Sequence, residues 1–74
     1  MDTHQTQTLR RVAVSAIAEN SNPIQALVRA GVDFDTAIVM ADRIWREGLA
    51  IKLDQLGNGL LTASGRNYLN GSRP

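Results

Sequence analysis

Residues 31–69 constrain the fold of this chain more than any other part of its sequence. A helical pattern of apolar residues runs up to Gly48, and residues 49–54 then alternate between apolar and polar side chains, as a half-buried strand does. Asn58-Gly59 is a strong signal for a two-residue hairpin turn, because both central residues of a type I′ turn need a positive φ. A second apolar run and a further helical pattern follow. This order of helix, hairpin and helix predicts a small α+β domain.

Two more helices are expected ahead of this stretch. Apolar side chains recur at helical spacing over residues 6–19, which predicts an amphipathic helix. Asn22 is a good N-cap, and Pro23 suits the first helical position, where its missing N–H costs nothing. A second short helix is therefore expected to begin at this pair and to end at Gly31, which can adopt a left-handed conformation. After the hairpin, Thr62 is expected to cap the last helix.

The third helix is expected to start at Asp33 or Asp35, either of which can cap it. At about 100° per residue its buried face comprises Ala37, Met40, Ala41 and Ile44. The opposite face comprises Asp35, Val39, Asp42 and Arg46. Ile38 and Trp45 fall side by side on one flank.

Length and composition narrow the class of protein. A chain of 74 residues predicts one domain, residues 1–74, with segments 1–5 and 70–74 as mobile tails. It has no cysteine, so neither disulfides nor thiolate metal sites are expected. The polar N-terminus and the absence of a long apolar run predict a cytoplasmic protein without membrane contact. Eight basic and seven acidic residues neither support nor exclude binding to nucleic acid.

Two short motifs resemble the winged-helix domain of MarR-type bacterial regulators. Residues 42–49 (DRIWREGL) stand where that family has D-R-L-x-x-x-G-L, and residues 61–66 (LTASGR) are similar to its L-T-x-x-G-R element after the wing. The resemblance covers roughly residues 24–69. It implies a winged helix-turn-helix of three helices, a short two-stranded wing and a C-terminal helix. It also implies a small bacterial or phage transcriptional regulator that reads double-stranded DNA with its third helix.

The chain departs from that family in three respects. It has no room for the long terminal helices that the family uses to dimerise. Its expected wing is small, and residues 54–58 carry no basic side chain. Ile38 and Val39 occupy helix positions that usually hold polar side chains able to read bases.

Hydrogen-bonding side chains on the third helix are the candidates for base contacts, and those on the wing side are candidates for phosphate contacts. Val39 joins them because an apolar side chain can contact a thymine methyl group. The expected nucleic-acid-binding residues are Thr36, Val39, Arg43, Arg46, Lys52, Asn58 and Arg66.

An alternative hypothesis uses the same helix on a protein. Ile38, Val39 and Trp45 then form an exposed apolar interface, and the chain is an adaptor or inhibitor that binds a partner or self-associates. In a third interpretation Ile38 and Trp45 pack against the hairpin or the first helix as core residues.

Catalysis is not expected. His4 is the only histidine, and no nucleophile or orienting group can be assembled around it. Metal ligands at the usual spacings are missing, so neither a metal nor another cofactor is expected.

Overall fold

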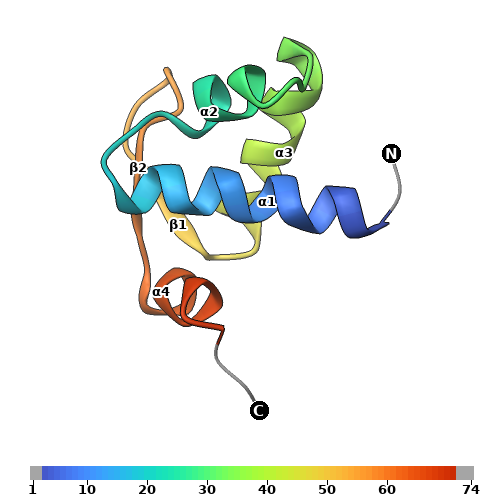
Figure 1. The fold of residues 1–74 in the computed structure, drawn as a ribbon. Helices are drawn as coiled ribbons and strands as arrows, with labels where there is room; N and C mark the ends of the chain where they lie inside the picture. The colour runs from blue at the N-terminus through green and yellow to red at the C-terminus, as the bar shows by residue number, and fades with distance from the viewer. Residues whose placement is uncertain (1–2, 72–74) are drawn as a thin grey trace.

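The computed structural model describes residues 3–71 and confirms both the α+β class and the predicted order of elements. In chain order the elements are α1 (Thr3–Ala18), α2 (Pro23–Arg29), α3 (Phe34–Arg46), β1 (Ala50–Lys52), β2 (Gly59–Leu61) and α4 (Ala63–Leu69). Helix α1 crosses the middle of the molecule, with α2 and α3 on one side of it and α4 on the other (Figure 1). The β1–β2 hairpin lies behind α1 in this view and links the two sides.

The predicted caps set where the short helices begin. The Asn22 side chain accepts hydrogen bonds from the N–H groups of Ile24 (2.9 Å) and Gln25 (3.1 Å) at the start of α2. Asp33, rather than Asp35, caps α3. Because the first N–H groups of a helix have no partner within it, these side chains stabilise each start locally.

The two ends of the chain follow the expectation less closely. Helix α1 begins at Thr3, so residues 3–5, expected to belong to a tail, are helical. Asn70 is the C-cap of α4. The rest of the expected tails, residues 1–2 and 72–74, lies outside the described residues.

The hairpin pairs β1 and β2 as antiparallel strands, as expected, but its turn differs from the prediction. Gly59 lies opposite Lys52 within the ladder, so the predicted two-residue turn at Asn58-Gly59 is wrong. The chain instead reverses over residues 54–57, with Gly57 at φ +92°, and the N–H of Leu53 donates to the Asn58 carbonyl (2.8 Å).

Two features explain why the chain reverses before Asn58 rather than at Asn58-Gly59. The Asp54 carboxylate accepts hydrogen bonds from the N–H groups of Leu56 (2.9 Å) and Asn58 (3.2 Å), which organises the loop from within. Gly59 is needed inside the strand, because a Cβ atom there would lie 2.7 Å from the Trp45 ring. The glycine of the Asn-Gly signal therefore serves packing rather than turn geometry.

The core contains buried apolar side chains from α1, α2, α3 and β1. Strand β2 and helix α4 contribute half-buried ones. The expected face of α3 is confirmed, since Ala37, Ala41 and Ile44 are buried and Met40 is partly so. The fully buried side chains with the largest volume are Ile17, Leu27, Ile44, Val14 and Pro23. This core holds α3 with its opposite face directed to solvent.

Candidate functional site

The exposed large apolar side chains are confined to one part of the described chain. All eight lie between α2 and β2, and none lies on α1 or α4. They are Val28, Phe34, Ile38, Val39, Ile51, Leu53, Leu56 and Leu60. Exposed apolar side chains that cluster mark an interaction site more often than scattered single residues do.

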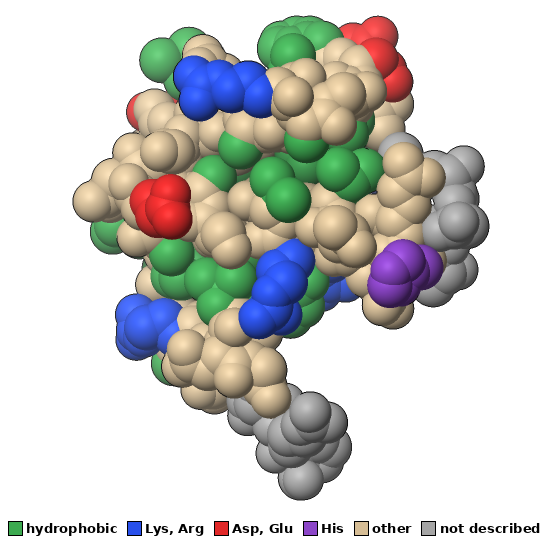
Figure 2. Space-filling view, in the orientation of Figure 1, with side chains coloured by type: hydrophobic (Ala, Val, Ile, Leu, Met, Phe, Trp, Pro, Cys, Tyr) green, Lys and Arg blue, Asp and Glu red, His purple; other side chains and the backbone are tan. Residues whose placement is uncertain are grey.

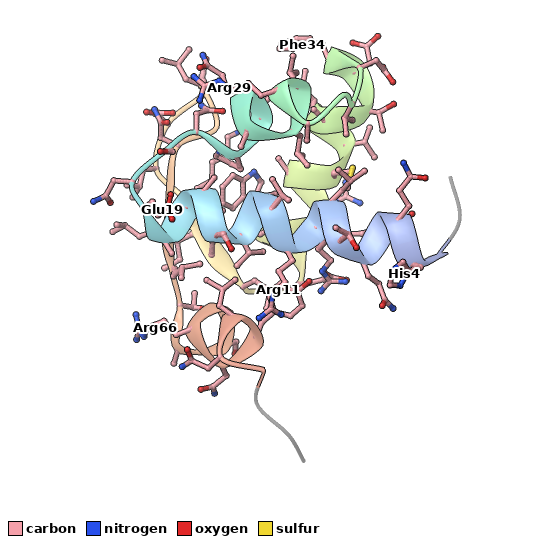
Figure 3. All side chains as sticks on the ribbon, in the orientation of Figure 1. His4, Arg11, Glu19, Arg29, Phe34 and Arg66 are labelled. Atoms are coloured by element: carbon pink, nitrogen blue, oxygen red, sulfur yellow. The ribbon has the colours of Figure 1, made fainter. Side chains whose placement is uncertain are left out.

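Several of these side chains line a groove of about 480 Å³ between the α2–α3 pair and the hairpin loop. Trp45 is half-buried and packs on the core, so it forms the inner part of the groove. Phe34 (61% exposed), Ile38 (40%) and Leu56 (74%) form its apolar rim. Figure 3 shows Phe34 at the α3 end of the molecule, pointing away from α1.

The hairpin loop that forms one wall of the groove is tied to the start of α2. The Asn22 side-chain amide donates to the Leu56 carbonyl (2.7 Å) and to Asn58 Oδ1 (3.2 Å). Gly57 lies against Ile24, whose Cδ1 atom would be 2.7 Å from a Cβ at this position. The exposed Leu56 is therefore held in place by its own backbone rather than by burial of its side chain.

The groove is lined by charged side chains of both signs, Asp42 and Lys52. One carboxylate, Asp42, lines it, whereas Asp33, Asp35 and Asp54 are sequence neighbours of lining residues but do not line it themselves. Lys52 also lines the groove, and Arg46 is paired with Asp42 at 2.9 Å.

Two of these carboxylates are kept ionised by their own hydrogen bonds. The hydroxyl of Thr36 donates to Asp33 and lowers the pKa of that carboxyl. The side-chain amide of Asn58 does the same to the pKa of Asp54. Both therefore remain charged at neutral and mildly acidic pH.

Three of the residues expected to bind DNA have their polar groups engaged inside the molecule. The Thr36 hydroxyl donates to Asp33 Oδ1 (2.7 Å). Asn58 both donates to Asp54 Oδ2 (2.9 Å) and accepts from the Asn22 amide. The guanidinium group of Arg46 makes the ion pair with Asp42.

The other four are exposed and lie at three separate places on the surface. Val39 (64% exposed) and Arg43 lie beside a crevice between α1 and α3, away from the groove, whereas Lys52 lines the groove. Arg66 is on α4, across α1 from Phe34 (Figure 3), beside a hollow that the end of α1 and β2 also line. The Lys and Arg side chains on the face drawn in Figure 2 are likewise dispersed and form no continuous stripe.

The three residues expected at a protein interface divide in the same way. Ile38 and Trp45 meet in the groove, as their shared flank predicted, whereas Val39 does not line it. Trp45 also packs beside Gly59 of the hairpin, so it belongs to the core as well as to the groove. Phe34 and Leu56 were missed. The sequence held a signal for each of them. Phe34 is an apolar residue outside the buried stripe of the third helix, and Leu56 is an apolar residue in the connection between two strands.

In comparisons with known proteins, the chain matches no family model, no curated protein and no solved structure. Among residues 3–71, no helix is long and apolar enough to cross a membrane. The same residues contain no group of three or more His, Asp or Glu side chains placed to hold a metal ion.

Proposed function

We propose that this chain is a protein-interaction module of the winged-helix type, acting as an adaptor or inhibitor that binds a partner in the groove between α3 and the hairpin loop. The order of three helices, a hairpin and a closing helix is compatible with a winged helix-turn-helix. Such a fold serves unrelated functions, so the task must be argued from the surface.

The observation that carries the proposal is the apolar groove, which three of the eight large exposed apolar side chains among residues 3–71 line. Binding sites are concave and mostly apolar, with a few polar groups at the rim. A half-buried tryptophan surrounded by exposed aliphatic and aromatic side chains is typical of the centre of a protein interface. The loop bearing Leu56 is already held in place, which reduces the entropy that binding would cost.

The second candidate is DNA binding, in which α3 enters the major groove as in a transcriptional regulator. Exposed Arg43, on α3, and exposed Lys52, on the hairpin, favour it. The charge of α3 and its flanking residues disfavours it, since residues 33–47 carry four carboxylates against two guanidinium groups. Phosphate contacts supply most of the affinity for DNA, and these carboxylates would oppose them.

The proposal can be tested by selecting displayed peptides on the full chain and repeating each binding measurement on Leu56→Asp. Leu60→Asp is the matched control, because Leu60 is exposed on the hairpin but does not line the groove. We expect enriched peptides to lose at least tenfold in affinity to Leu56→Asp and little to Leu60→Asp. Peptides that are indifferent to both substitutions would contradict binding in the groove.

The rival function is tested by fluorescence anisotropy with mixed-sequence duplex DNA at low salt. If the chain is a protein-interaction module, we expect no DNA binding that depends on Arg43. Tight binding that falls steeply with salt and is lost in Arg43→Ala would instead establish the DNA-binding alternative.

A further inference from the structure

The dipeptide Asn-Gly occurs twice in the chain, at residues 58–59 and 70–71. An asparagine that precedes glycine is prone to spontaneous deamidation, because the glycine has no side chain to hinder attack of its nitrogen on the asparagine side chain. We propose that Asn70 is a modification site, which deamidates in the folded protein, whereas Asn58 is protected by the contacts of the hairpin loop.

The reaction at Asn70 is a cyclisation followed by hydrolysis. The backbone nitrogen of Gly71 forms a bond to Cγ of Asn70, while the bond between Cγ and the side-chain nitrogen breaks. The proton that the Gly71 nitrogen loses leaves with the amide group as ammonia. Water then opens the resulting succinimide ring at one of its two carbonyls, which gives aspartate or isoaspartate. The reaction consumes only water.

Hydrogen bonds hold Asn58 away from the geometry that this cyclisation needs. Its side-chain amide donates to Asp54 Oδ2 (2.9 Å), and its Oδ1 atom accepts from the Asn22 amide (3.2 Å). Its backbone carbonyl accepts from the N–H of Leu53 (2.8 Å), and Gly59 is paired in the hairpin ladder. The ring can therefore form at Asn58 only after the loop and the end of the ladder have opened, and paired strands open rarely.

The second Asn-Gly pair lies at the end of α4 and is held less firmly. Asn70 is exposed and is the C-cap of the helix. The Gly71 N–H donates to the Tyr68 carbonyl at 3.3 Å, which is longer than the usual N–H···O distance. Among residues 3–71 no hydrogen bond engages the Asn70 side chain. Because the ends of helices open at little cost in free energy, Gly71 can reach the Asn70 side chain without disturbing the core.

Deamidation would have different consequences at the two asparagines. Asn58 lines the groove, and an aspartate there would lose its hydrogen bond to Asp54 and place a second carboxylate beside it. Asn70 is not among the residues that line the groove. Deamidation confined to Asn70 therefore adds a negative charge to the protein and leaves the wall of the groove intact.

The experiment incubates the full chain at neutral pH and physiological temperature, once folded and once in enough urea to unfold it. Peptide mapping by mass spectrometry follows Asn58 and Asn70 in the same molecules, so that each is the control for the other. In the folded chain we expect Asn70 to deamidate at least tenfold faster than Asn58. In urea the two rates should agree within about threefold, because both asparagines then precede a glycine in an unfolded chain.

The variant Asn22→Asp tests the source of the protection. Aspartate caps a helix as well as asparagine does, but its carboxylate cannot donate to Asn58 Oδ1 or to the Leu56 carbonyl. We expect Asn58 to deamidate at least fivefold faster in this variant, and Asn70 to keep its wild-type rate. Circular dichroism confirms that the variant is folded, and if it is not, the comparison of the folded and unfolded wild type decides alone.

Each contrary result overturns a defined part of the proposal. Equal rates at Asn58 and Asn70 in the folded chain would refute it. A slower reaction of Asn58 in urea as well would assign the difference to the neighbouring sequence instead of the fold. If neither asparagine reacts in the folded chain, although both react in urea, the end of α4 is protected and Asn70 is not a modification site. An unchanged rate at Asn58 in folded Asn22→Asp would refute the protective role of the Asn22 amide.

Discussion

The two sides of α1 use their side chains in opposite ways. On the closed side, formed by α1 and α4, charged groups reach partners within the molecule. The Arg11 guanidinium donates to the carbonyls of Tyr68 (3.4 Å) and Leu69 (2.5 Å) at the end of α4. Arg10 lies over the Tyr68 ring at 5.3 Å and also pairs with Glu47 of the connection after α3. On the open side, formed by α2, α3 and the hairpin, apolar side chains remain exposed around the groove.

The comparison shows that a count of basic residues is a poor measure of the positive surface available to a ligand. Arg10 and Arg11 hold helices together, and Arg46 is paired with Asp42. Cations at the C-terminus of a helix interact favourably with its unpaired carbonyls, which is the role of Arg11 at α4. The open side keeps exposed cations at Arg43 and Lys52 beside its carboxylates, so its apolar groove, rather than its charge, distinguishes it from the closed side.

The largest effect is expected where the closed side is packed most tightly. In Gly65→Ala the new Cβ atom would collide with the Leu49 carbonyl oxygen and lie 2.8 Å from Leu61 Cδ2. We expect a loss of about 3 kcal/mol in the free energy of unfolding, because neither backbone can move away without undocking α4. Urea denaturation followed by circular dichroism measures it. Ser64→Ala, at an exposed neighbouring position, should stay within about 0.5 kcal/mol of wild type. A fully stable Gly65→Ala would show that α4 is not closely docked.

Trp45 both lines the groove and packs on the core, so its removal should affect binding and stability. Its ring is half-buried and lies over Gly59, so we expect Trp45→Ala to lower the free energy of unfolding by about 2 kcal/mol, less than for a fully buried tryptophan. Trp45→Phe, which retains a ring, should recover about half of the loss. Thermal denaturation followed by circular dichroism provides the measurement. An unchanged melting temperature for Trp45→Ala would assign this residue to the open surface alone.

What could be predicted from the sequence was local. Asn22, Asp33 and Thr62 cap helices through contacts within three residues, so the local sequence predicted the caps Asn22 and Thr62 and limited the cap of α3 to Asp33 or Asp35. The turn at Asn58-Gly59 failed because the tertiary contact of Trp45 with residue 59 overrode a local signal.

The candidate site was predictable only in part, for the same physical reason. Helical geometry brought Ile38 and Trp45 together, because both lie on one element. Whether Phe34 and Leu56 stay exposed depends on which other elements fail to cover them. The role of Arg11 depends on carbonyls 57 and 58 residues away. Neither property can be obtained from spacing along the chain.

Arg11→Ala should have an intermediate effect. The substitution removes two hydrogen bonds from a charged donor to the last carbonyls of α4, and we expect a loss of about 1 kcal/mol in the free energy of unfolding. The rate of hydrogen exchange should increase most at the Asn70 amide, which donates to the Arg66 carbonyl in the last turn. Arg66→Ala is the control, since this exposed arginine lies on the same helix. If both variants lose the same stability, Arg11 contributes only general charge and not a specific clamp.

The hairpin loop should respond to acid. The pKa of Asp54 is lowered in the folded protein, so its contribution to stability is complete above the unfolded value of about 3.9 and is lost as the pH falls through the lower folded value. Asp54→Asn should therefore melt at a lower temperature than wild type at pH 6. The difference in melting temperature should narrow toward pH 3, where the carboxyl of the wild type becomes protonated. A difference that stays constant across this range would mean that the charge of Asp54 does not organise the loop.

The smallest effect on stability is expected at the rim of the open side. Phe34 and Leu56 expose most of their side chains, so Phe34→Ala and Leu56→Ala should each change the free energy of unfolding by no more than about 0.5 kcal/mol. The loop should keep its shape in Leu56→Ala, because the Asn22 amide holds the carbonyl of residue 56 and not its side chain. The same variants should weaken several-fold the binding of displayed peptides selected on the full chain, as measured by titration of Trp45 fluorescence. Ile44→Ala is the contrasting control, since this buried side chain should cost about 3 kcal/mol. A large loss of stability at Phe34 or Leu56 would mean that these side chains support the fold, and the distinction between a closed side that stabilises and an open side that binds would then be wrong.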